Sequence, residues 1–207
     1  MKKRMISLLL ALVLILSLLP ATALAAGEIG ELITVNGQKL IYNGTPVTCQ
    51  FDNGRGSVTW DGETLTLDSV NLKYTDYDCP GDITDSILYE GEDLIIELQG
   101  ENNILGLDNG IYITGGSLTI TGEGSLTVDA SDYSINVRGN IAFTGGSVTA
   151  KTIIDAANDI IISGDSTYVK ADDASSSADA RGISAGRDVI ISGGTVIASG
   201  NASGSTT

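Results

Sequence analysis

The sequence predicts an all-β protein whose chain winds into a single-stranded parallel β-helix, or β-solenoid, with about three short strands in each coil. Three observations predict this fold. A short segment with the pattern apolar, any, apolar, hydroxyl, glycine returns along the chain. Its apolar residues alternate with a period of two, which points one side of each strand inward. No proline follows Pro80, as expected where each strand donates hydrogen bonds to its neighbours.

The repeated segment ends on glycines at 100, 122, 145, 164 and 193, which lie 22, 23, 19 and 29 residues apart. The longest interval contains ADDASSSADA (171–180), which reads as a polar loop inserted into a regular unit. The clearest copies are LTITG (118–122), IAFTG (141–145), IIISG (160–164) and VIISG (189–193). IELQG (96–100) is a variant and LTLDS (65–69) a weaker relative.

Each unit also has an apolar pair before and another after this segment, such as Ile111-x-Ile113 and Leu126-x-Val128. Three strands and three turns in about 22 residues suit one coil of a solenoid. A β-sandwich of short, regularly spaced strands is the alternative, but it does not explain why the same three-strand unit returns in phase. We expect right-handed coiling. We also expect one internal column of Ile120, Phe143, Ile162 and Ile191.

The two ends of the repeat region differ. Residues 26–64 are expected to form an N-terminal hairpin or cap, and residues 65–207 the β-helix repeats. ITVNGQKLIY (33–42) and SVTWDGETLTL (57–67) read as hairpins that turn on Asn36-Gly37 and Asp61-Gly62. Together they are expected to plug the N-terminal end, with Trp60 and Phe51 as apolar stoppers. The sequence ends on SGNASGSTT (199–207) with no amphipathic cap, so further repeats or an anchoring module are expected partners at that end.

Residues 1–25 have the three regions of a secretory signal peptide. A basic start is followed by an apolar run from Met5 to Leu19 and by Ala23-Leu24-Ala25, which predicts cleavage after Ala25. A membrane anchor is the alternative, but the apolar run is short for a span of roughly 20 residues. The protein is therefore expected to be secreted, extracellular or on the cell surface of a bacterium.

The amino-acid composition excludes several classes of function. Lys plus Arg total 11 and Asp plus Glu total 26, a formal net charge of −15, so nucleic acid is not an expected partner. No histidine is present, which excludes Ser-His-Asp and Cys-His catalysis and metal sites that depend on histidine. The adjacent acids Asp172 and Asp173 could serve a glycoside hydrolase only if they flanked a water. They lie in a Ser/Ala-rich segment and read more simply as a solvated turn.

Two further groups of residues leave alternatives open. Cys49 and Cys79 could form a disulfide in an exported chain, or remain two thiols. YTDYDCPGDITD (74–85) places four carboxylates within a short segment, and these could bind Ca²⁺ or form an acidic surface loop. The four are Asp76, Asp78, Asp82 and Asp85.

The repeats resemble those of secreted Gram-positive surface proteins with carbohydrate-binding parallel β-helix repeats of the polygalacturonate-binding type. The resemblance lies in DNGIYITGGSLTITGEGSLTV (108–128), SVTWDGETLTL (57–67) and RGISAGRDVIISGGTVIASG (181–200), and it spans most of residues 56–200. It implies a β-helix that binds acidic plant polysaccharide, sometimes with calcium. It supplies no catalytic signature.

Candidate carbohydrate-binding residues follow from the alternation in the strand before each repeated segment. Because Ile111 and Ile113 should point inward, Tyr112 should point outward. The same outward column would contain Leu88, Tyr112, Asn136, Asp155 and Ser184. Tyr89 and Tyr133 are expected in nearby turns. We therefore name Tyr89, Tyr112, Tyr133 and Asn136 as candidates, with an ordinary mixed exterior as the alternative.

The sequence thus predicts a non-catalytic extracellular module that binds polysaccharide or a cell-surface glycan, with calcium as the one candidate cofactor. A structural stalk or adhesin segment of a larger surface protein is the alternative from a different class. A pectin-degrading β-helix enzyme is the third reading, and the missing histidine argues against it.

Overall fold

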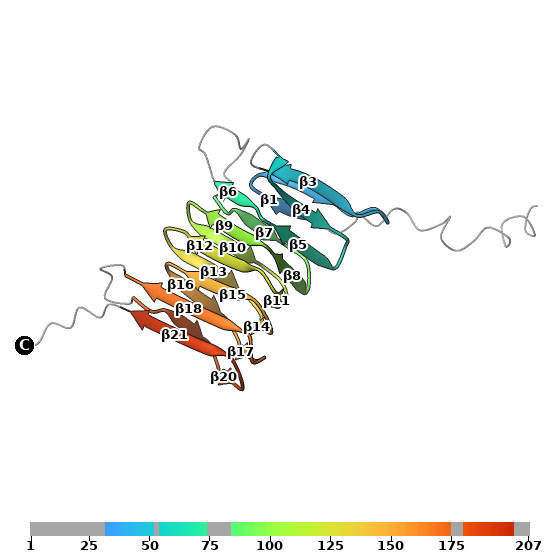
Figure 1. Ribbon diagram of the computed structural model, residues 1–207. Helices are drawn as coiled ribbons and strands as arrows, with labels where there is room; N and C mark the ends of the chain where they lie inside the picture. The colour runs from blue at the N-terminus through green and yellow to red at the C-terminus, as the bar shows by residue number, and fades with distance from the viewer. Residues whose placement is uncertain (1–31, 52–53, 74–83, 175–179, 201–207) are drawn as a thin grey trace, which may run out of the picture. The chain divides into compact units, whose positions relative to one another are not determined.

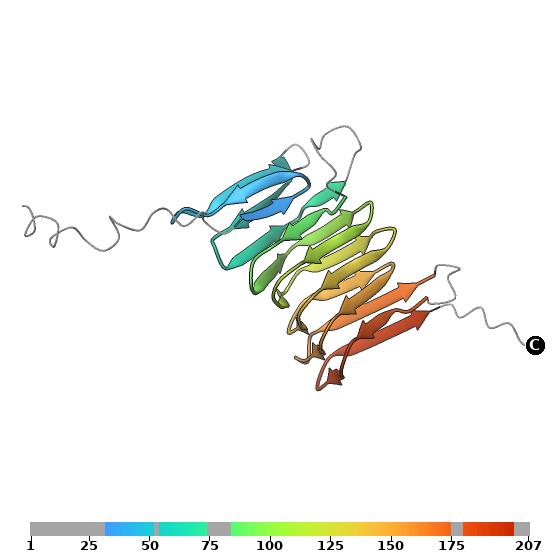
Figure 2. The same ribbon diagram turned by 180° about the vertical axis from the view of Figure 1, so that it is seen from behind.

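The elements of the described chain are all β-strands, arranged in three sheets (Figures 1 and 2). The computed structural model describes residues 32–51, 54–73, 84–174 and 180–200. Within these residues no helix is long and apolar enough to cross a membrane. The predicted all-β class is confirmed.

The three sheets are named here in the order in which the repeating strands reach them. The first contains β1 (Leu32–Val35), β2 (Gln38–Ile41), β7 (Ile87–Tyr89), β10 (Asn109–Ile113), β13 (Tyr133–Val137), β16 (Ile153–Ala156) and β19 (Ile183–Ala185). The second contains β3 (Val47–Phe51), β4 (Gly56–Trp60), β5 (Thr64–Asp68), β8 (Leu94–Gln99), β11 (Leu118–Gly122), β14 (Ile141–Phe143), β17 (Ile160–Ile162) and β20 (Val189–Ile191). The third contains β6 (Asn71–Lys73), β9 (Glu101–Leu105), β12 (Ser125–Asp129), β15 (Ser147–Ala150), β18 (Tyr168–Asp173) and β21 (Thr195–Gly200).

From β7 onward, consecutive strands fall into the first, second and third sheet in turn. Each pairs in parallel with the strand three places along the chain, as β8 does with β11 and β11 with β14. This is the arrangement that a β-solenoid requires. A sandwich of antiparallel strands, the alternative considered for the sequence, does not describe it.

The predicted internal column is present in the strand register. Ile120 pairs with Phe143, Phe143 with Ile162, and Ile162 with Ile191. The first three side chains are fully buried, whereas Ile191 is 55% exposed. The exposure arises because β20 is the last strand of its sheet in the described part of the chain.

Antiparallel hairpins close the opposite end of the stack. β1 pairs antiparallel with β2 across the Asn36-Gly37 turn, where both residues have positive φ, 48° and 77°. β4 pairs antiparallel with β5, and the Asp61 carboxylate accepts the backbone N–H groups of Glu63 and Thr64 in the turn between them. Both predicted hairpins are therefore observed. Strand β3, which pairs with β4, was not anticipated from the sequence.

The core is one continuous apolar cluster that runs from these hairpins through the stacked strands. Its largest side chains are Trp60, Tyr89 and Phe143, all fully buried. The rings of Trp60 and Tyr89 meet edge to face with centroids 5.8 Å apart. Trp60 therefore does form an apolar stopper under the hairpins, whereas Phe51 on β3 is only half-buried.

Candidate functional site

The candidate site is the outer face of the first sheet. Tyr112 pairs in register with Leu88 on one side and Asn136 on the other. Asn136 pairs with Asp155, and Asp155 with Ser184. The first four side chains are half-buried between buried neighbours, so they point outward as the alternation predicts, whereas all three residues of β19, Ser184 among them, are half-buried. The register aligns them into one column across five strands.

Arg138, which follows β13 directly, contacts Tyr112. Its guanidinium carbon lies 5.9 Å from the centre of the Tyr112 ring, and Nη2 donates a hydrogen bond to the Tyr112 hydroxyl at 3.3 Å. That hydrogen bond raises the pKa of the Arg138 guanidinium, which therefore remains charged. A cation held against an aromatic ring fixes the ring on the surface. It also places a positive charge on the outside of an acidic protein.

A shallow depression lies beside the column. It has a volume of about 200 Å³ and is lined by Tyr133, Ile153, Asp155, Arg181 and Ser184. This is smaller than the roughly 300–1,000 Å³ that encloses a compact ligand. The depression and the aligned column together therefore suit a polymer that lies across the surface better than a small molecule that is enclosed in a pocket.

A polar network links Asn136 in the column to Asn109 at the start of β10 and to Asp85 just before β7. Asn136 Nδ2 lies 3.5 Å from Asn109 Oδ1, and Asn109 Nδ2 donates to Asp85 Oδ1 at 2.7 Å. Asp85 is only 9% exposed. Burial raises the pKa of the Asp85 carboxyl, and the hydrogen bonds from Asn109 partly oppose that rise. The network therefore ends on a carboxyl group that is directed toward Asn109.

Of the predicted calcium ligands, only Asp85 lies among the described residues. Asp76, Asp78 and Asp82 lie outside them, so the calcium site stays a prediction. Among the side chains that the structure does describe, no group of three or more acids or cysteines is placed to hold a metal ion. Cys49 lies half-buried on β3, and burial raises the pKa of its thiol. Cys79 lies outside the described residues, so their pairing stays a prediction too.

Tyr89 is the one candidate carbohydrate-binding residue that the structure removes. It was expected in an exposed turn, but it is the last residue of β7 and its side chain is fully buried against Trp60. The alternation explains this, because Ile87 and Tyr89 share the inward side of β7 while Leu88 points outward. A ring inside the core cannot stack on a sugar. Tyr112, Tyr133 and Asn136 remain on the outer face.

The adjacent carboxylates Asp172 and Asp173 point to opposite sides of β18. Asp172 lies outside, where the Ser199 hydroxyl donates to it and lowers the pKa of its carboxyl. Asp173 is buried and accepts the backbone N–H of Arg181 at 2.9 Å. The two groups therefore do not face a common water, and both have structural partners.

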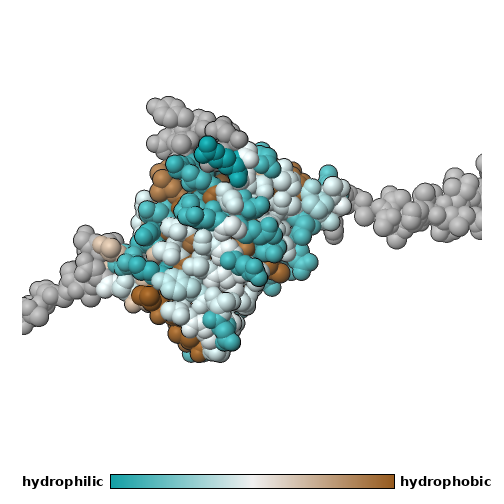
Figure 3. Space-filling model, in the orientation of Figure 1, coloured by the Kyte–Doolittle hydropathy of each residue, from teal (hydrophilic) through white to brown (hydrophobic). Residues whose placement is uncertain are grey.

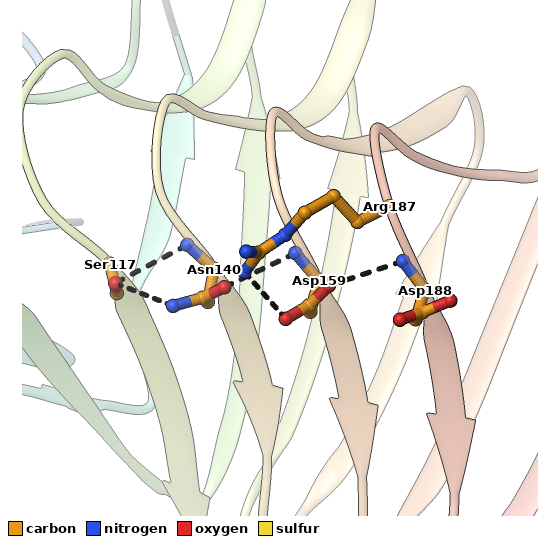
Figure 4. Close-up of polar contacts among 5 residues, drawn as sticks. All are labelled: Ser117, Asn140, Asp159, Arg187 and Asp188. Carbon is orange, nitrogen blue, oxygen red and sulfur yellow. Dashed lines mark hydrogen bonds and ion pairs between the residues drawn. The ribbon is translucent and has the colours of Figure 1, made fainter.

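Sequence reasoning missed a polar ladder that precedes the strands of the second sheet (Figure 4). The Asp93 carboxylate accepts the backbone N–H of Ser117, and the Ser117 hydroxyl accepts the backbone N–H of Asn140. The Asn140 amide oxygen accepts the backbone N–H of Asp159, and the Asp159 carboxylate accepts the backbone N–H of Asp188. These four hydrogen bonds are 2.7–3.3 Å long. Arg187 also forms a 2.7 Å ion pair with Asp159. The signal in the sequence is a short polar residue directly before each of the four clearest copies of the repeated segment, and Asp93 stands in the same position before Leu94, which pairs with Leu118.

Comparison of the chain with known protein families, with curated proteins and with solved structures finds no match.

Proposed function

We propose that this protein is an extracellular, non-catalytic module that binds polysaccharide along the outer face of the first sheet. In this proposal the three parallel sheets are the walls of a right-handed β-helix with three strands per coil. One observation carries the proposal: the in-register column of Leu88, Tyr112, Asn136, Asp155 and Ser184.

The column supports an extended ligand because neighbouring strands lie roughly 4.8 Å apart, so five strands span about 19 Å. A polymer that follows the stacking direction would meet one outward side chain from each strand. Tyr112 offers an apolar ring, and Asn136, Asp155 and Ser184 offer hydrogen-bond partners for hydroxyl groups. The resemblance of the repeats to carbohydrate-binding β-helix proteins supports the same ligand class.

Charge limits which polysaccharides can bind. The chain carries a formal charge of −15, so a polyanionic glycan is repelled unless cations intervene. Arg138 and Arg181 lie at the proposed face and reduce the repulsion locally. We therefore expect neutral glycans to bind without metal, and acidic plant glycans to bind with the help of calcium.

Affinity electrophoresis in gels that contain a neutral or an acidic plant polysaccharide tests the proposal. The protein should be retarded, and the polysaccharide should gain no new reducing or unsaturated ends. Tyr112→Ala should weaken retention without lowering Tm by more than a few degrees, because the ring contributes contact but little core volume.

Tyr168→Ala is the matched control, since Tyr168 is a half-buried tyrosine on the third sheet rather than the first. Equal loss of retention in both variants would contradict the assignment of the face. Retention on no glycan of a broad panel would favour the stalk or adhesin function, and release of cleavage products would favour an enzyme.

A further inference from the structure

Asparagine is followed directly by glycine at four places in the chain, and in this pair the asparagine side chain is most open to attack by its own backbone. The attacking atom is the nitrogen of the following residue, and glycine has no side chain to hinder it. The pairs are Asn36-Gly37, Asn43-Gly44, Asn53-Gly54 and Asn109-Gly110. Asn53 lies outside the described residues, so the structure distinguishes the other three.

Two of these asparagines are held by hydrogen bonds. Asn36 lies in the turn between β1 and β2, where its Nδ2 donates to the backbone carbonyl of Lys73 at 3.1 Å. Asn109 is the first residue of β10, and its Nδ2 donates to the Asp85 carboxylate at 2.7 Å. Gly110, whose nitrogen would attack Asn109, is buried within the same strand. Attack at either asparagine therefore requires the local structure to open first.

Asn43 has neither restraint. It lies in the connection 42–46 between β2 and β3, where both Asn43 and Gly44 are exposed. Its side chain forms no hydrogen bond to any residue within the described ranges. Gly44 has a φ of 91°, and no atom beyond its chain neighbours lies within 4 Å of the position that a Cβ would occupy. Figure 3 shows hydrophilic and neutral residues at the corner of the surface where β3 begins in Figure 1.

We propose that Asn43 is a site of spontaneous deamidation in the folded protein. The backbone nitrogen of Gly44 forms a bond to Cγ of Asn43, the bond from Cγ to Nδ2 breaks, and Nδ2 leaves as ammonia with the proton that the Gly44 nitrogen loses. Water then opens the resulting five-membered imide at one of its two carbonyl carbons. The product is aspartate or isoaspartate at position 43, and its carboxyl group is ionised at neutral pH.

The fold should tolerate this change. Isoaspartate lengthens the backbone by one methylene group, and the space beside Gly44 is open. Tyr42, one residue before Asn43, has its ring against Gly62 in the turn between β4 and β5, which fixes the start of the connection. The modified protein should therefore stay folded and carry one more negative charge than the unmodified protein.

Peptide mapping by mass spectrometry, after incubation of the purified protein in mildly alkaline buffer, tests the proposal. Fragment ions assign the conversion to each asparagine separately. Asn43 should convert at least about tenfold faster than Asn36 and Asn109, since tenfold protection requires an opening free energy of only about 1.4 kcal/mol. In denaturant the three should convert at similar rates, because all precede glycine and no folded structure protects them.

Asn43→Gln is the matched control, because a glutamine would have to form a larger ring, and it should abolish conversion at this position alone. Asn43→Asp reproduces the charge of the product and should leave Tm unchanged. No conversion at Asn43 in the native protein, or equal native rates at the three asparagines, would overturn the proposal. The same ranking in denaturant would also overturn it, since the sequence and not the fold would then set the rates. A lower Tm for Asn43→Asp would contradict a folded product.

Discussion

At the scale of single residues, burial separates two aromatic side chains that lie on strands of different sheets, Phe143 on β14 and Tyr112 on β10. Phe143 fills the internal column between Ile120 and Ile162 and is fully buried. Tyr112 lies outside under Arg138. Because a deleted core side chain leaves a cavity and a deleted surface ring does not, the two positions should differ sharply in their contribution to stability.

Phe143→Ala should therefore lower the free energy of unfolding by about 3–5 kcal/mol. Tyr112→Ala should lower it by less than about 1 kcal/mol, since it removes one exposed cation–ring contact. Urea unfolding at equilibrium, followed by tryptophan fluorescence of Trp60, measures both. Similar losses in the two variants would show that the assignment of inner and outer faces is wrong.

Asp85 gives the molecule a pH dependence of stability. Burial raises the pKa of this carboxyl in the folded state. The folded protein therefore binds the proton more tightly than the unfolded chain does. As a result, stability is lost as the pH rises from the ordinary carboxyl range through the raised pKa.

Asp85→Asn should remove that loss and keep an oxygen acceptor for Asn109. In the presence of a chelator, the variant should gain more stability over the unaltered protein at about pH 7 than at about pH 3. Asp132→Asn, at an exposed turn, serves as the control. Thermal melts across this pH range that show the same difference at every pH would contradict the prediction.

At the scale of elements, the polar ladder joins β8, β11, β14, β17 and β20 through the polar residue directly before each strand, and Figure 4 shows its last four members. Asp159 holds β20 with two contacts, because its carboxylate accepts the N–H of Asp188 and pairs with Arg187. A neutral side-chain hydrogen bond contributes about 0.5–1.5 kcal/mol, and one to a charged group more. Among the described strands β20 pairs with β17 alone, so there the contacts of Asp159 are a large share of what holds the strand.

Asp159→Ala should open β20 locally while the rest of the stack stays folded. The amides of Val189–Ile191 should exchange faster by roughly tenfold, which corresponds to about 1.4 kcal/mol, while those of Ile141–Phe143 should not change. Hydrogen exchange with mass spectrometry measures both segments in one experiment. Asp165→Ala, which removes an exposed carboxylate from the next turn, is the control.

At the scale of the whole molecule, an excess of carboxylates favours the binding of divalent cations over that of anions. The segment 74–85 concentrates four of these acids, and a ligand that binds only the folded state stabilises it by mass action. At a free calcium concentration of about 100 times Kd, the gain is about 2.7 kcal/mol. The same ion would bridge the protein to an acidic glycan.

Millimolar calcium should therefore raise Tm above its value in chelator, and it should restore retention on polygalacturonate. A double variant with Asp76→Asn and Asp78→Asn should lose both effects while keeping retention on neutral glycans. A Tm that is the same with calcium and with chelator would identify the segment as a solvated acidic loop.

Much of the fold could be predicted because a β-strand has a side-chain period of two and the same unit recurs. These two regularities were enough to place Ile120, Phe143 and Ile162 in one internal column and Tyr112, Asn136 and Asp155 in one external column. Both columns depend only on local alternation and on the repeat spacing. The sequence by itself therefore determined these repeated strands and the direction of these side chains, whereas it did not predict β3.

The tertiary structure decided what covers each surface. The alternation along β7 directs Tyr89 inward, but only the tertiary structure shows what covers it, since β1 pairs with β7 there and Trp60 packs against the ring. The burial of Asp85 next to Asn109 and the exposure of Ile191 at the end of its sheet also depend on neighbours distant in the sequence. Local pattern does not contain this information, because burial is a property of the elements that meet and not of the strand alone.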